Sequence, residues 1–68
     1  MILVTGAGGK TGRTICQKLV DAGLQVRAWL RRPDESHPAT EQYIGDMSAA
    51  ADWQQACAGI SKIYQICP

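Results

Sequence analysis

Short apolar runs alternate with amphipathic stretches along the 68-residue chain. Residues 1–5 are apolar and rich in β-branched side chains with little alternation, which is typical of a strand buried on both faces of a parallel sheet. Residues 24–30 alternate between apolar and polar side chains and predict a second strand. Shorter apolar runs at 43–45 and 63–66 predict a third and a fourth. The polar segment 34–42, which contains a proline, predicts a loop with at most a short irregular helix.

Two segments between these strands have the spacing of amphipathic helices. In the first, at about residues 11–22, apolar side chains recur every three or four positions, and Gly23 is expected to end the helix. Either Asp46 or Ser48 is a suitable N-cap for the second helix, which is expected to end at Gly59. The apolar face of this second helix comprises Ala50, Trp53, Cys57 and Ile60.

Strands alternating with helices predict an α/β fold with a parallel sheet. Right-handed crossovers in a doubly wound arrangement place the four strands in the order 3-2-1-4, with helices on both faces of the sheet. This is half of a Rossmann fold, so residues 1–68 are expected to form a single, partial dinucleotide-binding domain. The fourth strand would lie at a sheet edge made apolar by Ile63, Tyr64 and Ile66. Such an edge favours a homodimer through the fourth strand, or cover by a C-terminal half that is missing here.

Composition narrows the class of protein further. Hydrophobic residues make up 46% and charged residues 19% of the chain, as in a folded globular domain, and a net charge of +1 gives no reason to expect nucleic acid as a partner. Three widely spaced cysteines and a single histidine argue against a zinc site or a disulfide framework, and no metal ligand is assigned. Because no apolar run is as long as a membrane span and no leader pattern precedes the first strand, we expect a cytoplasmic protein with no membrane partner.

A glycine-rich turn joins the first strand to the first helix. Gly6, Gly9 and Gly12 are spaced three apart. The first permits a tight turn, the second lets the backbone approach a pyrophosphate, and the third lets the helix pack closely on the strand. The amides and the dipole at the start of the helix attract phosphate. The predicted phosphate site comprises Gly6, Gly8, Gly9, Lys10, Thr11 and Gly12.

The segment Gly9-Lys10-Thr11 also matches the end of the phosphate-binding loop of nucleoside triphosphatases. That loop requires another glycine five residues before Gly9, and Val4 occupies this position inside the predicted strand. A nucleoside triphosphatase is therefore the less favoured alternative to a dinucleotide-binding protein. Lys10 is interpreted as a basic residue near cofactor phosphate, or as a solvated side chain.

The second strand ends in Arg31 and Arg32. In dinucleotide folds an acidic residue at this place binds the ribose 2′-hydroxyl, whereas arginine accommodates a 2′-phosphate through paired hydrogen bonds. The sequence therefore predicts NADP(H) as the cofactor, ahead of NAD(H). Asp46, after the third strand, is consistent both with a contact to adenine and with a helix N-cap.

Three stretches together resemble the start of atypical short-chain dehydrogenases of the NmrA-like group: LVTGAGGKTG at 3–12, VRAWLRRP at 26–33 and GDM at 45–47. The resemblance implies that the glycine turn holds the pyrophosphate and that Arg31 holds the 2′-phosphate. It also implies that Asp46 lies beside adenine, and we include the adjoining Met47 in the site.

The same resemblance limits the expected activity. Members of the group are several times longer, and neither Tyr43 nor Tyr64 is followed four residues later by the lysine of the Tyr-x-x-x-Lys pair. No catalytic residue is therefore assigned. We expect an NADP(H)-binding module related to an oxidoreductase and not catalytic alone. A non-enzymatic redox sensor or interaction protein is the alternative, because many NmrA-like proteins resemble redox sensors.

Overall fold

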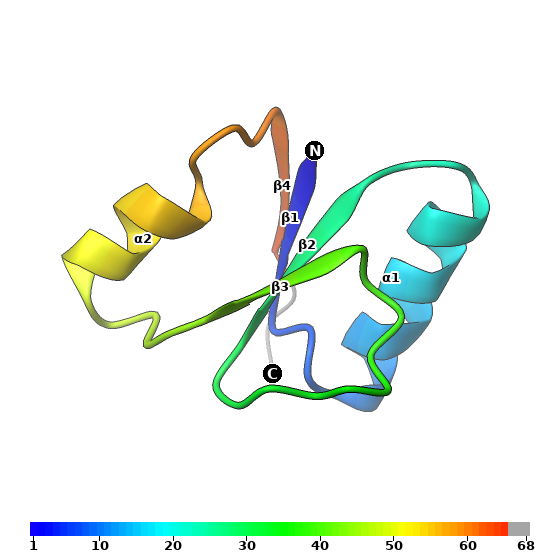
Figure 1. Cartoon of the computed structure of the whole chain (residues 1–68), viewed down its shortest axis with the longest axis horizontal. Helices are drawn as coiled ribbons and strands as arrows, with labels where there is room; N and C mark the ends of the chain where they lie inside the picture. Colours follow the sequence, from blue (N-terminus) through cyan, green and yellow to red (C-terminus); the bar gives the residue numbers. More distant parts are fainter. Residues whose placement is uncertain (66–68) are drawn as a thin grey trace.

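A four-stranded parallel sheet lies between two helices, one on each face (Figure 1). The computed structural model describes residues 1–65. The strands are β1 (Ile2–Thr5), β2 (Val26–Leu30), β3 (Glu41–Ile44) and β4 (Lys62–Gln65), and the helices are α1 (Lys10–Asp21) and α2 (Ala50–Ala56). The sheet order is β3-β2-β1-β4, and every neighbouring pair is parallel. The predicted α/β fold and the order 3-2-1-4 are confirmed.

β1 is an inner strand, and its register places Leu3 between Arg27 of β2 and Ile63 of β4. On the other side of β2, Trp29 pairs with Tyr43 of β3. Because all four strands run in the same direction, their carboxyl ends meet at one edge of the sheet. The glycine turn, the β2–β3 connection and the segment before α2 all begin at this edge.

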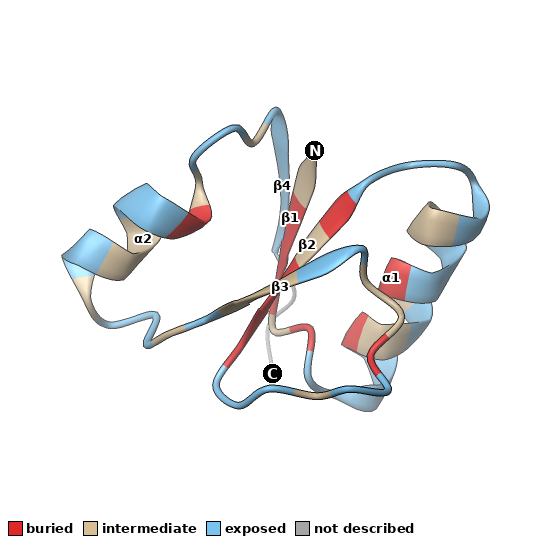
Figure 2. Ribbon diagram, viewed as in Figure 1, coloured by how far each residue is buried: buried red, intermediate tan, exposed pale blue. Residues whose placement is uncertain are grey.

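The sheet has a separate apolar core on each face. The core under α1 is made of Val4, Ala7, Cys16, Val26, Ala28 and Leu30. The core under α2 is made of Leu3, Trp29 and Ala56, with Tyr43, Trp53, Cys57 and Ile60 packed against them. The ring centroids of Trp29 and Trp53 are 4.6 Å apart in edge contact. Figure 2 shows that the buried residues are concentrated in β1 and β2 and on the sheet-facing side of α1.

The first helix ends as predicted, but β2 begins two residues later than expected. Gly23 has a φ of 84°, its N–H donates to the carbonyl of Val20, and the Leu24 N–H donates to the carbonyl of Leu19. This pair of bonds is a Schellman motif, which satisfies the last carbonyls of a helix. Leu24 therefore completes the end of α1 and does not join the strand, although it alternates with the residues that follow.

The predicted third strand, at 43–45, was placed too late in the chain. β3 covers Glu41–Ile44, and its two polar residues have partners. Glu41 accepts a hydrogen bond from Arg27 at 3.1 Å, and the Gln42 side chain bonds the backbone of Asp34. An edge strand accepts such polar residues because one side of it faces water. The predicted fourth strand included Ile66, which lies outside the described residues.

Neither predicted N-cap of the second helix is correct. The N-cap of α2 is Ala49, which makes no side-chain capping bond. The Asp46 carboxylate accepts hydrogen bonds from the N–H and the hydroxyl of Ser48, so both side chains are used in the turn before the helix. The helix ends at Ala56, and Gly59, with a φ of 75°, lies in the turn that follows.

Candidate functional site

A cleft of about 1090 Å³ opens at the carboxyl ends of the strands. It is bounded by the glycine turn after β1, the segment after β2 and the segment after β3, with Gln65 of β4 at its side. The cleft brings together all ten residues predicted for the site: Gly6, Gly8, Gly9, Lys10, Thr11, Gly12, Arg31, Arg32, Asp46 and Met47. These residues come from three separate parts of the sequence and meet only because the strands are parallel.

The glycines of the turn differ in what they contribute. Gly6 has a φ of 66°, a conformation that side chains disfavour, so it allows the tight turn predicted for it. A Cβ atom at Gly12 would lie 2.6 Å from the Ala7 Cα and 2.6 Å from the Gly6 carbonyl oxygen, so α1 packs closely on the turn after β1, whereas the prediction was close packing on the strand itself. A Cβ atom at Gly9 would meet nothing within 4 Å. The space beside Gly9 is open to the cleft, and its role toward a pyrophosphate stays a prediction.

The N-terminus of α1 follows this turn and has no capping side chain or acidic residue of its own. Gly9 is the N-cap, no side chain caps the helix, and the first turn contains no acidic residue. Lys10 and Thr11 are exposed and line the cleft. The first amides of a helix lack intrahelical partners and carry a partial positive charge, so this end of α1 attracts an anion.

Arg31 and Arg32 directly follow the last residue of β2 and are exposed at the cleft. Among residues 1–65, neither guanidinium has a hydrogen bond or an ion pair with another side chain. By contrast, Asp34 of the same segment is bound by Ser36 and by Arg13 of α1. The hydrogen bonds from Ser36, together with the Arg13 guanidinium, hold the pKa of Asp34 below its usual value.

The segment after β3 is fixed by side chains of α2. The Asp46 N–H donates to the Asp52 carboxylate at 3.0 Å, and the Trp53 ring N–H donates to the Met47 carbonyl at 2.6 Å. The hydrogen bonds from Ser48, and the nearby Arg31 guanidinium, lower the pKa of Asp46. An ionised Asp46 is thus held at the cleft next to Met47, whose side chain is 39% exposed.

Other lining residues were not predicted: Trp29, Leu30, Pro33, Asp34, Ser48 and Gln65. Trp29 and Leu30 were assigned to a strand, where alternation indicates burial but not proximity to a site. Gln65 was detectable in principle, because it is the last residue of a strand that ends at the same edge as the others. Asp34 and Ser48 lie in irregular segments, whose path the sequence pattern does not give.

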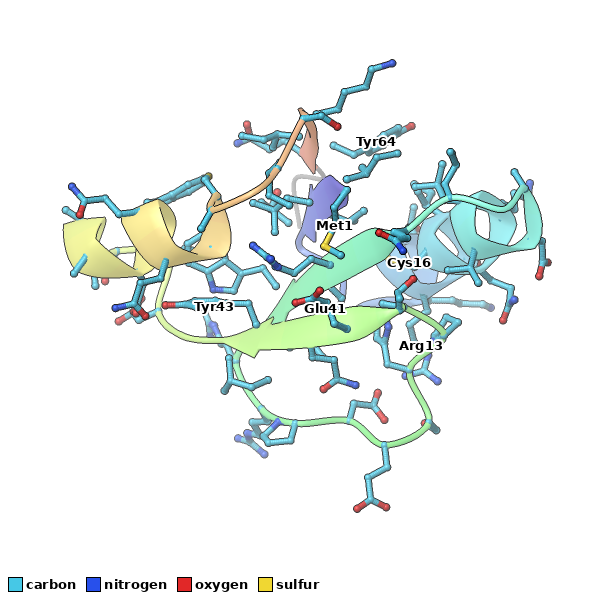
Figure 3. The ribbon with its side chains drawn as sticks, turned by 45° about the horizontal axis from the view of Figure 1, so that its top comes forward. Met1, Arg13, Cys16, Glu41, Tyr43 and Tyr64 are labelled. Carbon is cyan, nitrogen blue, oxygen red and sulfur yellow. The ribbon has the colours of Figure 1, made fainter. Side chains whose placement is uncertain are left out.

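Tyr43 and Cys16 lie away from the cleft. Tyr43 points from β3 toward α2 (Figure 3), and its hydroxyl donates to the Asp52 carboxylate at 2.7 Å. This hydrogen bond raises the pKa of Tyr43, and burial raises the pKa of the Cys16 thiol under α1. Within residues 1–65 no three histidine, cysteine or acidic side chains gather into a metal-binding group. Neither described helix is long and apolar enough to cross a bilayer.

The parallel sheet has the strand order of half a doubly wound fold. Its cleft combines a glycine turn, a helix N-terminus and basic side chains, and these features together define a Rossmann-type dinucleotide-binding domain. Residues 6–66 match the NAD(P)H-binding family, and the chain belongs to this family. It is an NAD(P)-binding Rossmann domain similar to those of short-chain dehydrogenases, as the resemblance of its motifs predicted.

Two curated relatives are dehydrogenases or reductases. The chain is 34% identical over 65 residues to a 3-beta-hydroxysteroid dehydrogenase from Mycolicibacterium neoaurum, covering 93% of this chain and 18% of the relative. It is 35% identical over 65 residues to a 2-alkyl-3-oxoalkanoate reductase from Stenotrophomonas maltophilia, covering 93% and 20%.

Among solved structures, a short-chain dehydrogenase/reductase superfamily protein from Agrobacterium tumefaciens with bound NAD superposes with a TM-score of 0.85. The two are 30% identical, and the match covers 98% of this chain and 20% of that one. The chain therefore spans about a fifth of the length of the proteins it matches.

Proposed function

We propose that the cleft binds NADP(H) in preference to NAD(H), with the adenosine 2′-phosphate between Arg31 and Arg32. The observation that carries this proposal is the position of the two arginines. They follow β2 directly, at the place where dinucleotide folds contact the adenosine ribose, and they share one cleft with the glycine turn.

Charge supports the preference for the phosphorylated cofactor. A phosphate group at neutral pH carries a charge of about −1.5 to −2 and accepts paired hydrogen bonds from a guanidinium. Neither arginine is engaged by another side chain among residues 1–65, so binding a phosphate breaks no existing ion pair. The two acidic side chains of the cleft already have partners, since Asp34 is bound by Arg13 and Ser36 and Asp46 by Ser48.

With the 2′-phosphate at the two arginines, the proposal gives the other parts of the cofactor the following positions. The pyrophosphate lies against Gly8, Gly9 and the first amides of α1, with Lys10 and Thr11 at its rim. The adenine lies beside Asp46 and Met47. The nicotinamide, which supplies hydride chemistry when bound, extends toward Gln65.

NAD(H) is the alternative, and the bound NAD in the Agrobacterium tumefaciens structure favours it. Calorimetric titration of the 68-residue chain with NADPH, NADH and ATP-magnesium distinguishes the three nucleotides. We expect NADPH to bind at least about tenfold more tightly than NADH, because a hydrogen bond to a charged group contributes about 1.5–3 kcal/mol and 1.4 kcal/mol corresponds to tenfold. Arg31→Asp should narrow or reverse this ratio.

A matched control for the change in net charge is Lys18→Glu, on the outer surface of α1 and outside the cleft lining. It should leave the ratio of the two affinities unchanged. Gly9→Val should weaken NADPH and NADH together by obstructing the pyrophosphate. Equal affinities for NADPH and NADH in the parent chain contradict the proposed preference, and tight binding of ATP-magnesium alone favours the triphosphatase class.

We also propose that the chain belongs to the NmrA-like group and does not catalyse hydride transfer alone. Catalytic tyrosines work as proton donors at the substrate, whereas Tyr43 is bonded to Asp52 on the α2 side and does not line the cleft. The NAD(P)-binding role is compatible with a part of an oxidoreductase and with a redox sensor. Cofactor-dependent reduction of carbonyl or quinone compounds by the purified chain, above a Gly9→Val control, would contradict the proposed lack of activity.

A further inference from the structure

His37 lies in the β2–β3 connection but reaches the glycine turn after β1. Only 7% of the residue is exposed, and it is not part of the cleft lining. Its Nε2 atom lies 2.7 Å from the carbonyl oxygen of Ala7, and its Nδ1 atom lies 3.1 Å from the backbone nitrogen of Ala39. The imidazole therefore joins two backbone segments that are 30 residues apart in the sequence.

The partners of the ring fix its protonation. The Ala39 N–H can only donate, so Nδ1 of His37 must be the unprotonated acceptor. The Ala7 carbonyl can only accept, so Nε2 must carry the proton and donate it. The side chain is thus a neutral imidazole in the Nε2–H form, and both of its nitrogens are used by backbone groups.

The bond to Ala7 acts on the part of the turn that faces the cleft. The carbonyl of Ala7 and the N–H of Gly8 belong to one planar peptide group and point in opposite directions. Holding the carbonyl toward the buried imidazole therefore directs the Gly8 N–H away from it. Gly8 lines the cleft and Ala7 is fully buried, so one side of this peptide is anchored and the other lies at the site.

This anchor adds to the burial of Ala7 in the core under α1, because a buried methyl group does not by itself fix the orientation of the peptide group that follows it. Gly6, on one side of the held peptide, adopts a positive φ, and Gly8 and Gly9 follow without side chains. Three glycines in four positions give the backbone more conformations than any other residue type allows. The buried hydrogen bond from His37 to the Ala7 carbonyl favours one of these conformations.

We infer that His37 is a positioning residue for the dinucleotide: it holds the Ala7–Gly8 peptide in the orientation that presents the turn to the pyrophosphate. This inference rests on the proposed binding of a dinucleotide in the cleft. The β2–β3 connection has a second attachment, from Asp34 and Ser36 to Arg13 of α1. Loss of the imidazole should therefore release the glycine turn while leaving the arginine segment in place.

Two substitutions separate the two bonds of His37. The amide of glutamine reaches the position of Nε2 and can donate to the Ala7 carbonyl. The shorter amide of asparagine reaches only the position of Nδ1, where its oxygen can accept from the Ala39 N–H. We expect His37→Asn to weaken NADPH and NADH by about fivefold to tenfold, the value of one hydrogen bond of about 1 kcal/mol or slightly more. His37→Gln should retain affinity within about twofold.

The affinity for adenosine 2′-monophosphate separates two effects of His37→Asn. General damage to the cleft would weaken it, whereas loss of the proposed positioning role would leave it unchanged. This nucleotide lacks the pyrophosphate, so its affinity, measured by NMR titration, should be the same in the parent chain and in His37→Asn. Equal dinucleotide affinities in both variants, or weaker binding in His37→Gln than in His37→Asn, overturn the inference. Failure of the parent chain to bind either dinucleotide overturns the proposed function itself, and is seen without any variant.

If circular dichroism shows that His37→Asn does not fold, NMR measurements on the parent chain test the inference instead. Imidazole ¹⁵N shifts must show the neutral Nε2–H form, and the Gly8 amide resonance must move when NADPH is added. An Nδ1–H imidazole, or a Gly8 amide that is insensitive to NADPH, overturns the inference.

Discussion

Gly12 and Gly9 occupy the same turn but have opposite surroundings, which makes them a matched pair for a test at the scale of single residues. A methyl group at Gly12 would meet backbone atoms of Ala7 and Gly6 at 2.6 Å, and backbone cannot move aside as a flexible side chain can. We expect Gly12→Ala to lower the free energy of unfolding by about 1–3 kcal/mol, the usual cost of overpacking. Urea unfolding followed by circular dichroism measures it.

Gly9→Ala is the control, because its methyl group would enter open space. Alanine is a poorer N-cap than glycine, so we expect a loss below about 1 kcal/mol. Similar losses in the two variants would show that the close approach of α1 to the turn does not limit stability.

Sequence spacing predicted Gly6 and Gly12 well, because each of these two glycines answers a local steric requirement, whereas the structure shows none at Gly9. It did not identify His37, since a single histidine among polar residues has no pattern, and its partner Ala7 is 30 positions away. It also left Asp46 between two roles. The Asp46 side chain forms a turn with Ser48 and does not cap α2. This turn depends on the path of the chain rather than on residue type.

At the scale of elements, α2 is the part of the fold that depends most on outside support. It has seven residues and no side-chain N-cap, and a helix this short is unstable alone. Arg27 of β2 donates to the carbonyls of Ala56 and Ala58 at 2.6 and 2.8 Å, and it also pairs with Glu41. One partly buried guanidinium thereby satisfies the C-terminal end of α2 and ties it to the sheet.

We expect Arg27→Met, which keeps the aliphatic stem, to lower the free energy of unfolding by about 1–3 kcal/mol, because it removes charged hydrogen bonds to the partly buried carbonyl of Ala56 and the exposed carbonyl of Ala58. Hydrogen exchange should accelerate in α2 more than in α1. Arg32→Met, at an exposed position without a side-chain partner among residues 1–65, is the control and should leave both measurements unchanged. Uniform acceleration across both helices would mean that Arg27 supports the sheet and not α2 in particular.

The order and type of the elements were predictable, whereas several of their ends were not. Periodicity reports which positions alternate between apolar and polar side chains, but a residue whose backbone ends one element can continue the alternation of the next. Leu24 alternates with the residues of β2 but belongs to the end of α1. Glu41 and Gln42 looked like loop residues, but their backbone pairs with Arg27 and Ala28 of β2, and their side chains contact Arg27 and Asp34.

At the scale of the whole molecule, β4 leaves one edge of the sheet exposed. All four of its residues are exposed, including Ile63 at 52% and Tyr64 at 48%. Unpaired strand edges with apolar side chains associate readily, so we expect the isolated 68-residue chain to dimerise through β4. Light scattering should give twice the monomer mass at tens of micromolar, with a melting temperature that rises with concentration.

Ile63→Lys should return the chain to a monomer, because a charge on an edge strand opposes pairing. Leu24→Lys is the matched control, since Leu24 is similarly exposed at 44% but lies at the end of α1. It should leave the dimer intact. A parent chain that is monomeric at every concentration, with a constant melting temperature, contradicts the prediction.

The strand order also determines when the sheet can be completed during folding. β1 precedes the other three strands in the sequence and is an inner strand, yet one of its two neighbours is β4, and Ile2 pairs with Lys62 across almost all of the described residues. Parallel strands have no hairpin to bring them together, so this pairing requires closure of a very long loop before any contact energy is gained. Contacts of such high sequence separation slow the rate-limiting step of folding. During synthesis, β1 therefore acquires this neighbour only after α1, β2, β3 and α2 have all been made.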